Sequence, residues 1–250
     1  GLMGVLLVAA VCVMVGYRTR LATVVTFVLL VSLRWRNIWV MNGGDSLLRH
    51  MGFFLMLAPS GAALSVDRWR VARDRFWVHP LRAPWALRLI QVQISIVYLF
   101  TVWLKAQGER WSAGTAVSES LRVDDLVRFE LPWSVTDSLL VANLLTFGTL
   151  AVELALAVLI WNRQARPYVI ALGVALHLFI EVTMSLGFFS LVMILGYLAF
   201  APPDAASHVV DLVRSSLLRS RWGRLRRLAT ANDGARPRPR QATARAGVSR

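Results

Sequence analysis

Apolar residues occur in long, nearly uninterrupted stretches along the chain, and arginines or turn-forming residues mark the boundaries between these stretches. Stretches of about 18–20 apolar residues are typical of helices that cross a lipid bilayer. We predict seven spans, of which the second and the seventh are short: residues 2–17, 21–33, 46–64, 84–105, 138–161, 167–186 and 188–201. The pattern therefore predicts an all-α, polytopic transmembrane helical bundle of about six or seven spans.

The fourth predicted span is not apolar on every side. As a helix of 22 residues it would be about 33 Å long, which is enough to cross the hydrocarbon core of a bilayer. Its polar residues recur at intervals of three or four and so share one helical face: Arg88, Gln91, Ser95, Tyr98, Thr101 and Lys105. Because lipid cannot satisfy polar groups, we expect this stripe to face the protein interior or a water-filled cavity.

Shorter polar stripes occur in three other predicted spans: Asn143, Thr146, Thr149 and Glu153; His177, Glu181 and Ser185; and Asp45, Arg49 and His50. Ionisable residues at membrane depth are costly and often mark functional sites. A structural alternative stays open, in which Glu153 and His177 pair only to neutralise each other. His177 and Glu181 share a helical face that could chelate a metal, but two ligands are too few and we predict no metal site.

The composition supports a membrane protein and changes the interpretation of the charge. The chain is 56% hydrophobic and 17% charged, with a mean hydropathy of +0.55. A net charge of +14 would suit nucleic-acid binding, but eleven of the 27 arginines lie after Pro203 and fit a cytoplasmic tail. We therefore expect no nucleic-acid partner. Cys12 is the only cysteine, which excludes an intramolecular disulfide, and because Gly1 is not an initiator methionine we expect an earlier or trimmed start.

The distribution of arginine predicts the orientation in the cell membrane. Loops with excess arginine face the cytoplasm, and this places residues 18–20, 65–83 and 162–166 inside together with the C-terminus. The acidic connection 106–137 then lies outside. In this multi-pass arrangement both Asp45 and Lys105 lie at the outer rim.

Beyond the transmembrane domain, assigned to residues 1–203, the chain divides into two further parts. Residues 204–229 alternate apolar residues with arginines in a helical period, which is typical of an amphipathic helix on the anionic inner leaflet. Residues 230–250 are rich in alanine, arginine and proline without periodicity, so we expect them to be disordered.

Lys105 is the only lysine in a chain that otherwise uses arginine for positive charge. Two interpretations stay open. The ammonium group can extend to the membrane interface and form a salt bridge with Asp45. Alternatively, a desolvated lysine can lose its proton and act as a base, which arginine cannot do in practice.

The order of several motifs resembles the HTTM domain, the bacterial branch of the vitamin K-dependent gamma-carboxylase superfamily. The resemblance covers residues 20–203 and rests on six features: residues 42–47 (NGGDSL), 64–67 (LSVD), 91–105, 111–114 (WSAG), His177 and 189–193 (FSLVM). It implies a helical membrane enzyme whose site faces outward.

The resemblance also implies a cofactor and roles for individual residues. Lys105 would deprotonate reduced vitamin K or menaquinone, and oxygen would convert the quinol to a strong base for carboxylation or oxygenation of a peptide or protein substrate. His177 would be the second catalytic residue, and the remaining site residues would line the quinone site: Tyr98, Gln91, Asn42 and Asp45. The alternative function is a non-catalytic membrane protein that binds a lipid or peptide, or protects against one.

Overall fold

The computed structural model describes residues 1–35, 43–78, 80, 82–129, 131–132 and 137–234. The chain forms two units, Gly1–Ala201 and Pro202–Arg250. All regular structure in the described residues is helical, apart from one isolated antiparallel bridge between Val127 and Met184. The protein is therefore all-α, as the hydropathy pattern predicts.

The first unit contains ten α-helices and three short 3₁₀ helices among its described residues. The helices before the centre of the unit are α1 (Leu2–Val15), α2 (Thr19–Arg34), α3 (Gly43–Leu57), α4 (Val66–Val71) and η2 (Arg73–Arg75). They are followed by α5 (Trp85–Ala106), α6 (Glu109–Ser112), α7 (Ala116–Ser120), α9 (Leu139–Val158), η3 (Leu159–Trp161), α10 (Arg166–Thr183), α11 (Phe189–Gly196) and η4 (Tyr197–Phe200).

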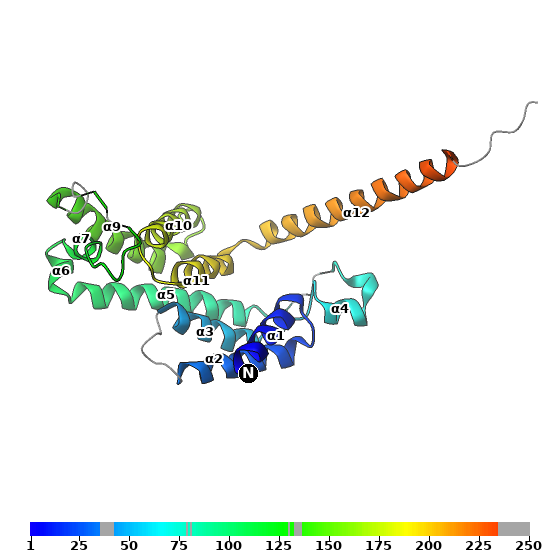
Figure 1. The fold of residues 1–250 in the computed structure, drawn as a ribbon, viewed down its shortest axis with the longest axis horizontal. Helices are drawn as coiled ribbons and strands as arrows, with labels where there is room; N and C mark the ends of the chain where they lie inside the picture. Colours follow the sequence, from blue (N-terminus) through cyan, green and yellow to red (C-terminus); the bar gives the residue numbers. More distant parts are fainter. Residues whose placement is uncertain (36–42, 79, 81, 130, 133–136, 235–250) are drawn as a thin grey trace, which may run out of the picture. The chain divides into compact units, whose positions relative to one another are not determined.

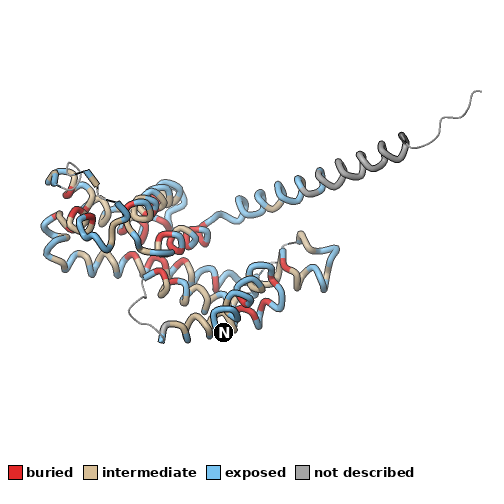
Figure 2. The backbone as a smooth tube through the Cα atoms, viewed as in Figure 1, coloured by how far each residue is buried: buried red, intermediate tan, exposed pale blue. Residues whose placement is uncertain are grey.

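Helix α5 is the central element of this unit. It packs against α9 on one side and α3 on the other, and α2 and α1 follow beyond α3 (Figure 1). Helix α10 packs against α9, while α11 contacts α10, α3 and α5. Figure 2 shows that buried positions face the neighbouring helices, and the outer sides of the helices are exposed. The buried core is where α5, α9, α10 and α11–η4 meet, and it contains Ile94, Tyr98, Leu156, Ile160, Met193 and Phe200.

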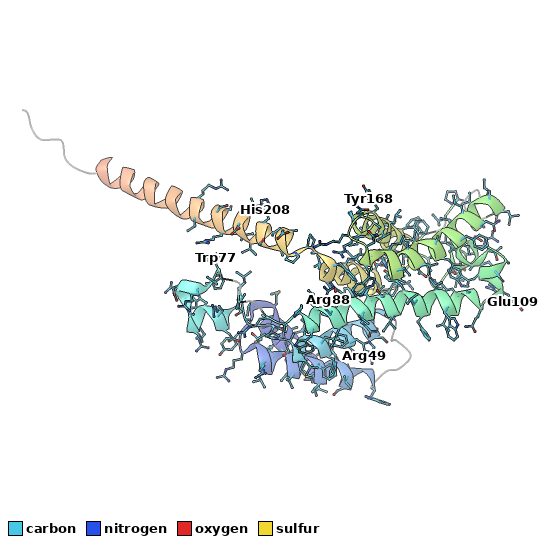
Figure 3. The ribbon with its side chains drawn as sticks, turned by 180° about the vertical axis from the view of Figure 1, so that it is seen from behind. Arg49, Trp77, Arg88, Glu109, Tyr168 and His208 are labelled. Carbon is cyan, nitrogen blue, oxygen red and sulfur yellow. The ribbon has the colours of Figure 1, made fainter. Side chains whose placement is uncertain are left out.

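The two ends of α5 carry different structures. In Figure 3, Trp77 and Arg88 lie near the beginning of α5, and Glu109 lies just beyond its other end. The arginine-rich segment 65–83 therefore precedes one end of α5, and the short helices α6 and α7 follow the other end. Lys105, in the last turn of α5, lies at the end that carries α6 and α7.

Three helical segments are long and apolar enough to cross a membrane: Trp85–Ala106, Leu139–Trp161 and Arg166–Thr183. A fourth is obtained when Phe189–Phe200 and Pro203–Ser216 are counted as one broken span. Helices α1 and α2 are apolar but shorter, and the 14 residues of α1 span about 21 Å against a hydrocarbon core of about 30 Å. The structure supports a membrane protein with three or four candidate spans, and six or seven are not confirmed.

Helices α1 and α3 end before the spans predicted for them, and in each case a particular residue explains the end of the helix. Helix α1 ends at Gly16, whose φ of 69° is left-handed and breaks the helix before the predicted end at residue 17. Helix α3 ends at Leu57, two residues before Pro59, whereas the predicted span continues to residue 64. A proline cannot donate the next helical hydrogen bond, so the helix stops before it.

Residues 64–67 (LSVD) connect α4 to the turn between α1 and α2 through hydrogen bonds. Ser65 caps α4 by accepting a hydrogen bond from Arg68 N–H at 3.0 Å. The Asp67 carboxylate accepts hydrogen bonds, each of 2.8 Å, from Arg18 N–H, Thr19 N–H and the Thr19 hydroxyl. The Thr19 N–H is the main cause that lowers the pKa of Asp67, and the other two donors and Arg70 add to it against a smaller opposing effect of burial.

Replacing Asp67 with asparagine is expected to destabilise the protein at neutral pH but not in acid. Because the folded-state pKa of Asp67 is below its ordinary value of 3.8, its contribution is complete above pH 3.8 and is lost as the pH falls through the lowered pKa. At pH 7 the melting temperature in detergent should drop by about 2–4 °C, the shift for about 1 kcal/mol in a chain of this size. The difference between wild type and Asp67→Asn should shrink below pH 3.8. A difference that stays constant with pH would show that the carboxylate charge is not involved.

The second unit contains the helix α12 (Pro203–Gly234), which begins directly after Pro202. This helix covers residues 204–229, where the sequence predicts an amphipathic helix, and it continues to Gly234. Alanine-rich sequence such as residues 229–231 has high helix propensity, which favours this extension. Residues 235–250 lie outside the described part of the chain, and the binding of the tail to anionic lipid stays a prediction.

Candidate functional site

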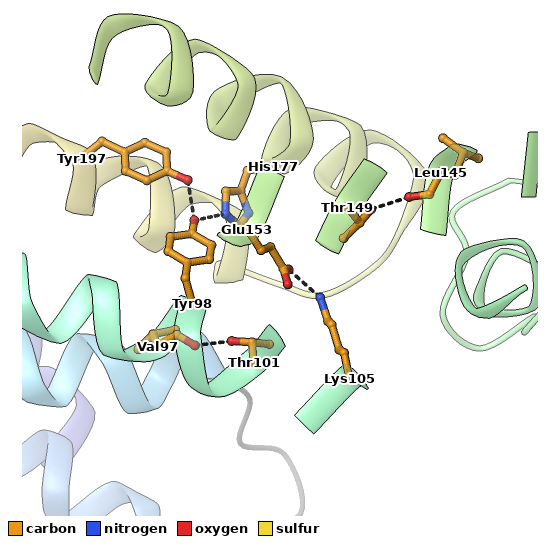
Figure 4. Close-up of polar contacts among 9 residues, drawn as sticks. All are labelled: Val97, Tyr98, Thr101, Lys105, Leu145, Thr149, Glu153, His177 and Tyr197. Atoms are coloured by element: carbon orange, nitrogen blue, oxygen red, sulfur yellow. Dashed lines mark hydrogen bonds and ion pairs between the residues drawn. The ribbon is translucent and has the colours of Figure 1, made fainter. Parts of the chain in front are cut away.

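Polar side chains from four elements meet where α5, α9, α10 and η4 pack together (Figure 4). Tyr98 and Lys105 are seven residues apart on α5 and so lie on the same face of that helix. Glu153 comes from α9, His177 from α10 and Tyr197 from η4. We call these five residues the polar cluster.

Lys105 forms an ion pair with Glu153 inside this bundle. The distance from Lys105 Nζ to Glu153 Oε1 is 2.5 Å, and the side chains are only 21% and 8% exposed. The ammonium group also lies 4.7 Å from the centre of the Trp111 ring, a cation–π contact with α6. The structure thus gives Lys105 a partner on α9, not the Asp45 partner considered from the sequence.

His177 belongs to a chain of hydrogen bonds with two tyrosines. Its Nε2 atom lies 2.8 Å from the Tyr98 hydroxyl, which is also hydrogen-bonded to the Tyr197 hydroxyl. All three residues are buried. Gly173 of α10 makes room for this arrangement, because a Cβ atom at that position would lie 2.6 Å from the Tyr197 hydroxyl oxygen.

The direction of this chain depends on which hydroxyl hydrogens are donated. If Tyr197 donates to Tyr98 and Tyr98 donates to His177 Nε2, both hydroxyl hydrogens are used. The opposite direction leaves the buried Tyr197 hydroxyl hydrogen without an acceptor among the described residues, and the first direction leaves the His177 Nδ1 hydrogen without one. In the first direction His177 is neutral with its hydrogen on Nδ1, and that hydrogen is available to a bound ligand.

Two atoms of the polar cluster are buried without a hydrogen-bond partner among the described residues. They are the Oε2 atom of Glu153 and the Nδ1 atom of His177. The Ser190 hydroxyl of α11 is also buried without a hydrogen-bond partner within the described part of the chain. Buried polar groups are normally satisfied, so such atoms are candidates for contact with a ligand. An acceptor on Glu153 and a donor on His177 are complementary in their chemistry to the hydroxyl groups of a reduced quinone.

Not every residue predicted from the sequence belongs to the cluster. Gln91 donates a hydrogen bond from Nε2 to the Ala199 carbonyl at 2.6 Å and accepts one from Arg88 at 3.0 Å. It lies two turns, or about 10 Å, from Tyr98 along α5. Gln91 therefore joins α5 to η4, and the structure does not bring it to the site. Asn42 lies outside the described residues.

Glu181 contacts the connection that precedes α9. Its Oε1 atom is 2.9 Å from Arg128, which also donates to the Met184 carbonyl at 3.0 Å. This contact ties the segment before α9 to the end of α10. The Glu153–His177 pair considered from the sequence is not what forms, because Glu153 bonds Lys105 and His177 bonds Tyr98. Within the described part of the chain, no group of three metal-ligating residues is arranged to hold a metal.

Asp45 lines a groove of about 750 Å³ at the N-terminal end of α3. The walls of this groove are mostly apolar: Gly44, Leu48, Leu126, Phe188, Leu191 and Val192. The Phe189 ring packs edge-on against His177 at 5.6 Å and also faces Gly43, so α11 connects the start of α3 with the cluster. None of the five cluster residues lines the groove that contains Asp45.

Tyr197 is the cluster residue that the sequence does not reveal. It lies in the short, apolar seventh predicted span, which has no polar stripe. The one available signal is its spacing of seven from Ser190, which places both residues on the same side of α11–η4. Two polar residues at that spacing in an apolar segment would have indicated an inward face.

Comparison with known proteins gives one match. A family model described as the HTTM domain matches residues 1–204, a range that includes the whole first unit, Gly1–Ala201. No curated protein and no solved structure matches the chain.

Proposed function

Because this chain belongs to the HTTM domain family, a membrane-associated domain of the gamma-carboxylase family, we propose that it is a membrane enzyme acting on a reduced quinone. Lys105 removes a proton from a quinol hydroxyl, at a site in the outer half of the bilayer with the C-terminus in the cytoplasm. One observation supports this proposal above others. A lysine–glutamate pair lies in an apolar bundle beside buried polar atoms that have no partner among the described residues.

Glu153 makes Lys105 usable as a base. In the ion pair the ammonium group carries the proton, but in a medium of low dielectric the proton can pass along the 2.5 Å contact to the carboxylate. Lys105 is then neutral and its nitrogen can accept a proton. In the step itself the hydroxyl O–H bond breaks, a new N–H bond forms on Lys105, and the electron pair stays on the hydroxyl oxygen.

His177 would stabilise the charge that develops in this step. When Tyr197 donates to Tyr98 and Tyr98 donates to Nε2 of His177, the ring hydrogen is on Nδ1, which is then a donor. A donor fixed before the reaction stabilises a developing negative charge without reorganisation. Phe189 packs edge-on against the ring of His177 and helps to fix its orientation. Reduced vitamin K or menaquinone, when bound, supplies the acidic hydroxyl and the reactivity toward oxygen needed for carboxylation or oxygenation of a peptide or protein substrate.

The proposal is tested with the full chain purified in detergent. Reduced menaquinone and oxygen are supplied, and quinol conversion and oxygen uptake are measured. We expect conversion well above the rate without protein, and quinone should be extractable from the purified protein. Oxidised menaquinone is the control, because it carries no hydroxyl proton to remove and should support no uptake. Quinol conversion equal to the protein-free rate, with no bound quinone, would contradict the proposal.

A non-catalytic role is the second candidate, and one observation favours it. The Lys105–Glu153 pair and the Gln91–Ala199 hydrogen bond both connect separate helices, as purely structural contacts do. In that case the protein binds a lipid or peptide, or protects against one, and Lys105 contributes only its charge. The turnover assay of the wild-type chain separates the two functions, because a non-catalytic protein converts no quinol above the protein-free rate.

A further inference from the structure

A second groove lies at the other end of the first unit, where α2 begins and α3 ends. Its volume is about 320 Å³, and Arg20 and Arg82 both contribute to its walls. The remaining polar walls come from Thr19, Thr23, Ser60 and Asp67, and short apolar residues complete the groove. This groove shares no lining residue with the polar cluster.

The hydroxyl groups in this groove are already engaged. The Thr23 hydroxyl donates to the Arg20 carbonyl at 3.0 Å, and the Ser60 hydroxyl donates to the Leu55 carbonyl at 2.8 Å. The Thr19 hydroxyl donates to Asp67, whose carboxylate also takes two backbone N–H groups at the start of α2. Asp67 also lines the groove, and these three donors already engage its carboxylate. The two arginines are the groups left to bind a ligand.

Other arginines at this end contact the protein itself. Arg70 lies over the Tyr17 ring, Arg73 lies over the Trp69 ring, Arg75 pairs with Asp74, and Arg68 donates to the Arg75 carbonyl. Arg20 and Arg82, in contrast, form no ion pair within the described residues. Guanidinium groups that form no ion pair with the protein are suited to bidentate binding of a phosphate.

Exposed tryptophans indicate the depth of this end in the membrane. Trp69 is 46% exposed and Trp85 is 43% exposed, and both lie on segments that adjoin Arg82 in sequence. Tryptophan is enriched where the bilayer meets water, at the level of the lipid headgroups. Next to the groove, α2 exposes Val24 and Val28 on an apolar surface suited to acyl chains.

We propose that this groove binds the phosphate of an anionic phospholipid, with Arg20 and Arg82 holding the phosphate oxygens. The acyl chains lie along the exposed apolar side of α2. Basic pockets beside membrane helices bind such headgroups, and the positive groove, its depth and its apolar flank meet these requirements together. The site is independent of the quinol chemistry and of the arginines in α12.

Binding is measured with the full chain in detergent micelles titrated with phosphatidylglycerol, using the rise in melting temperature or native mass spectrometry. In the double variant Arg20→Gln/Arg82→Gln the affinity should fall about 30-fold. Each arginine near the headgroups contributes a factor of roughly five to six in affinity, and the two factors multiply. The control Arg73→Gln/Arg75→Gln removes the same charge from the same end and should change the affinity less than about two-fold. Arg20→Lys/Arg82→Lys, which keeps the charge, should retain most of the binding and shows that the groove still folds.

Three outcomes would overturn the proposal. Equal loss of affinity in the control double variant would mean that the lipid responds to the overall charge of this end. Equal binding of phosphatidylcholine would mean that the anionic charge is not recognised. Saturation by inorganic phosphate at the affinity found for phosphatidylglycerol would assign the groove to free phosphate. Preference for phosphatidylglycerol over both probes, lost only in the groove variants, supports a lipid site.

Discussion

Substitution of Lys105 by arginine is expected to leave the protein folded but to lower quinol turnover by about 10²–10⁴-fold, the usual contribution of a general base. Arginine can keep the ion pair with Glu153, so the contact between α5 and α9 survives. It cannot release its proton at accessible pH, so no neutral nitrogen is available to accept one. Turnover of reduced menaquinone by the purified variant, with its melting temperature as the check on folding, measures both effects.

Two companion variants make the result for Lys105 interpretable. Lys105→Ala should lose turnover to the same degree as Lys105→Arg, because both lack the base. Thr149→Val is the control, since the Thr149 hydroxyl only donates to the Leu145 carbonyl of its own helix at 2.7 Å, one turn from Glu153 (Figure 4). It should keep wild-type turnover. If Lys105→Arg also keeps it, Lys105 contributes only its charge and is not the base.

The second large effect is expected on stability. Glu153→Leu should lower the free energy of unfolding by about 3–5 kcal/mol, because it removes one partner of a largely buried ion pair and leaves the Lys105 ammonium without its counter-ion. The contact with Trp111 compensates only in part. The midpoint of denaturation by a competing detergent or by heat, compared with wild type, measures the loss.

A double variant shows whether this loss comes from the unpaired charge. Lys105→Met/Glu153→Leu replaces both partners by apolar side chains of similar size and should recover most of the lost stability, while remaining inactive. The single variants Lys105→Met and Glu153→Leu complete a thermodynamic cycle, whose coupling energy measures the interaction between the two side chains. A double variant as unstable as Glu153→Leu alone would show that Glu153 stabilises the fold through packing and not through its charge.

Helix positions were predicted well from hydropathy, and distances between helices were not. The fourth predicted span, residues 84–105, differs from α5 by one residue at each end. The period of 3.6 identifies which residues share a face of a helix, but it contains no information on how one helix is rotated or shifted against the next. The ion pair of Lys105 with Glu153 depends on that shift, so the stripes on α5 and α9 were visible and their contact was not.

The same limit explains the predictions that differed at Gln91 and Asp45. Gln91 shares the polar face of α5, yet its depth along the helix places it opposite the Ala199 carbonyl instead of the polar cluster. Asp45 was placed at the same membrane level as Lys105, but level alone does not determine neighbours, and Asp45 lines a groove at the start of α3 while Lys105 pairs with Glu153. The extents of the first and third predicted spans differ from the helices because an apolar stretch predicts a helix without fixing where Gly16 or Pro59 interrupts it.

The close contact between Gly173 and Tyr197 has a consequence for protein design. The position of His177 is fixed through Tyr98 by Tyr197, and Tyr197 fits only because Gly173 has no side chain. Transplanting Lys105, Glu153 and His177 onto another helical bundle would therefore copy the reactive groups without their alignment. A design that transfers this site must therefore also include a glycine at the position of Gly173. A larger residue there would displace Tyr197 and misalign His177, although none of the reactive groups would change.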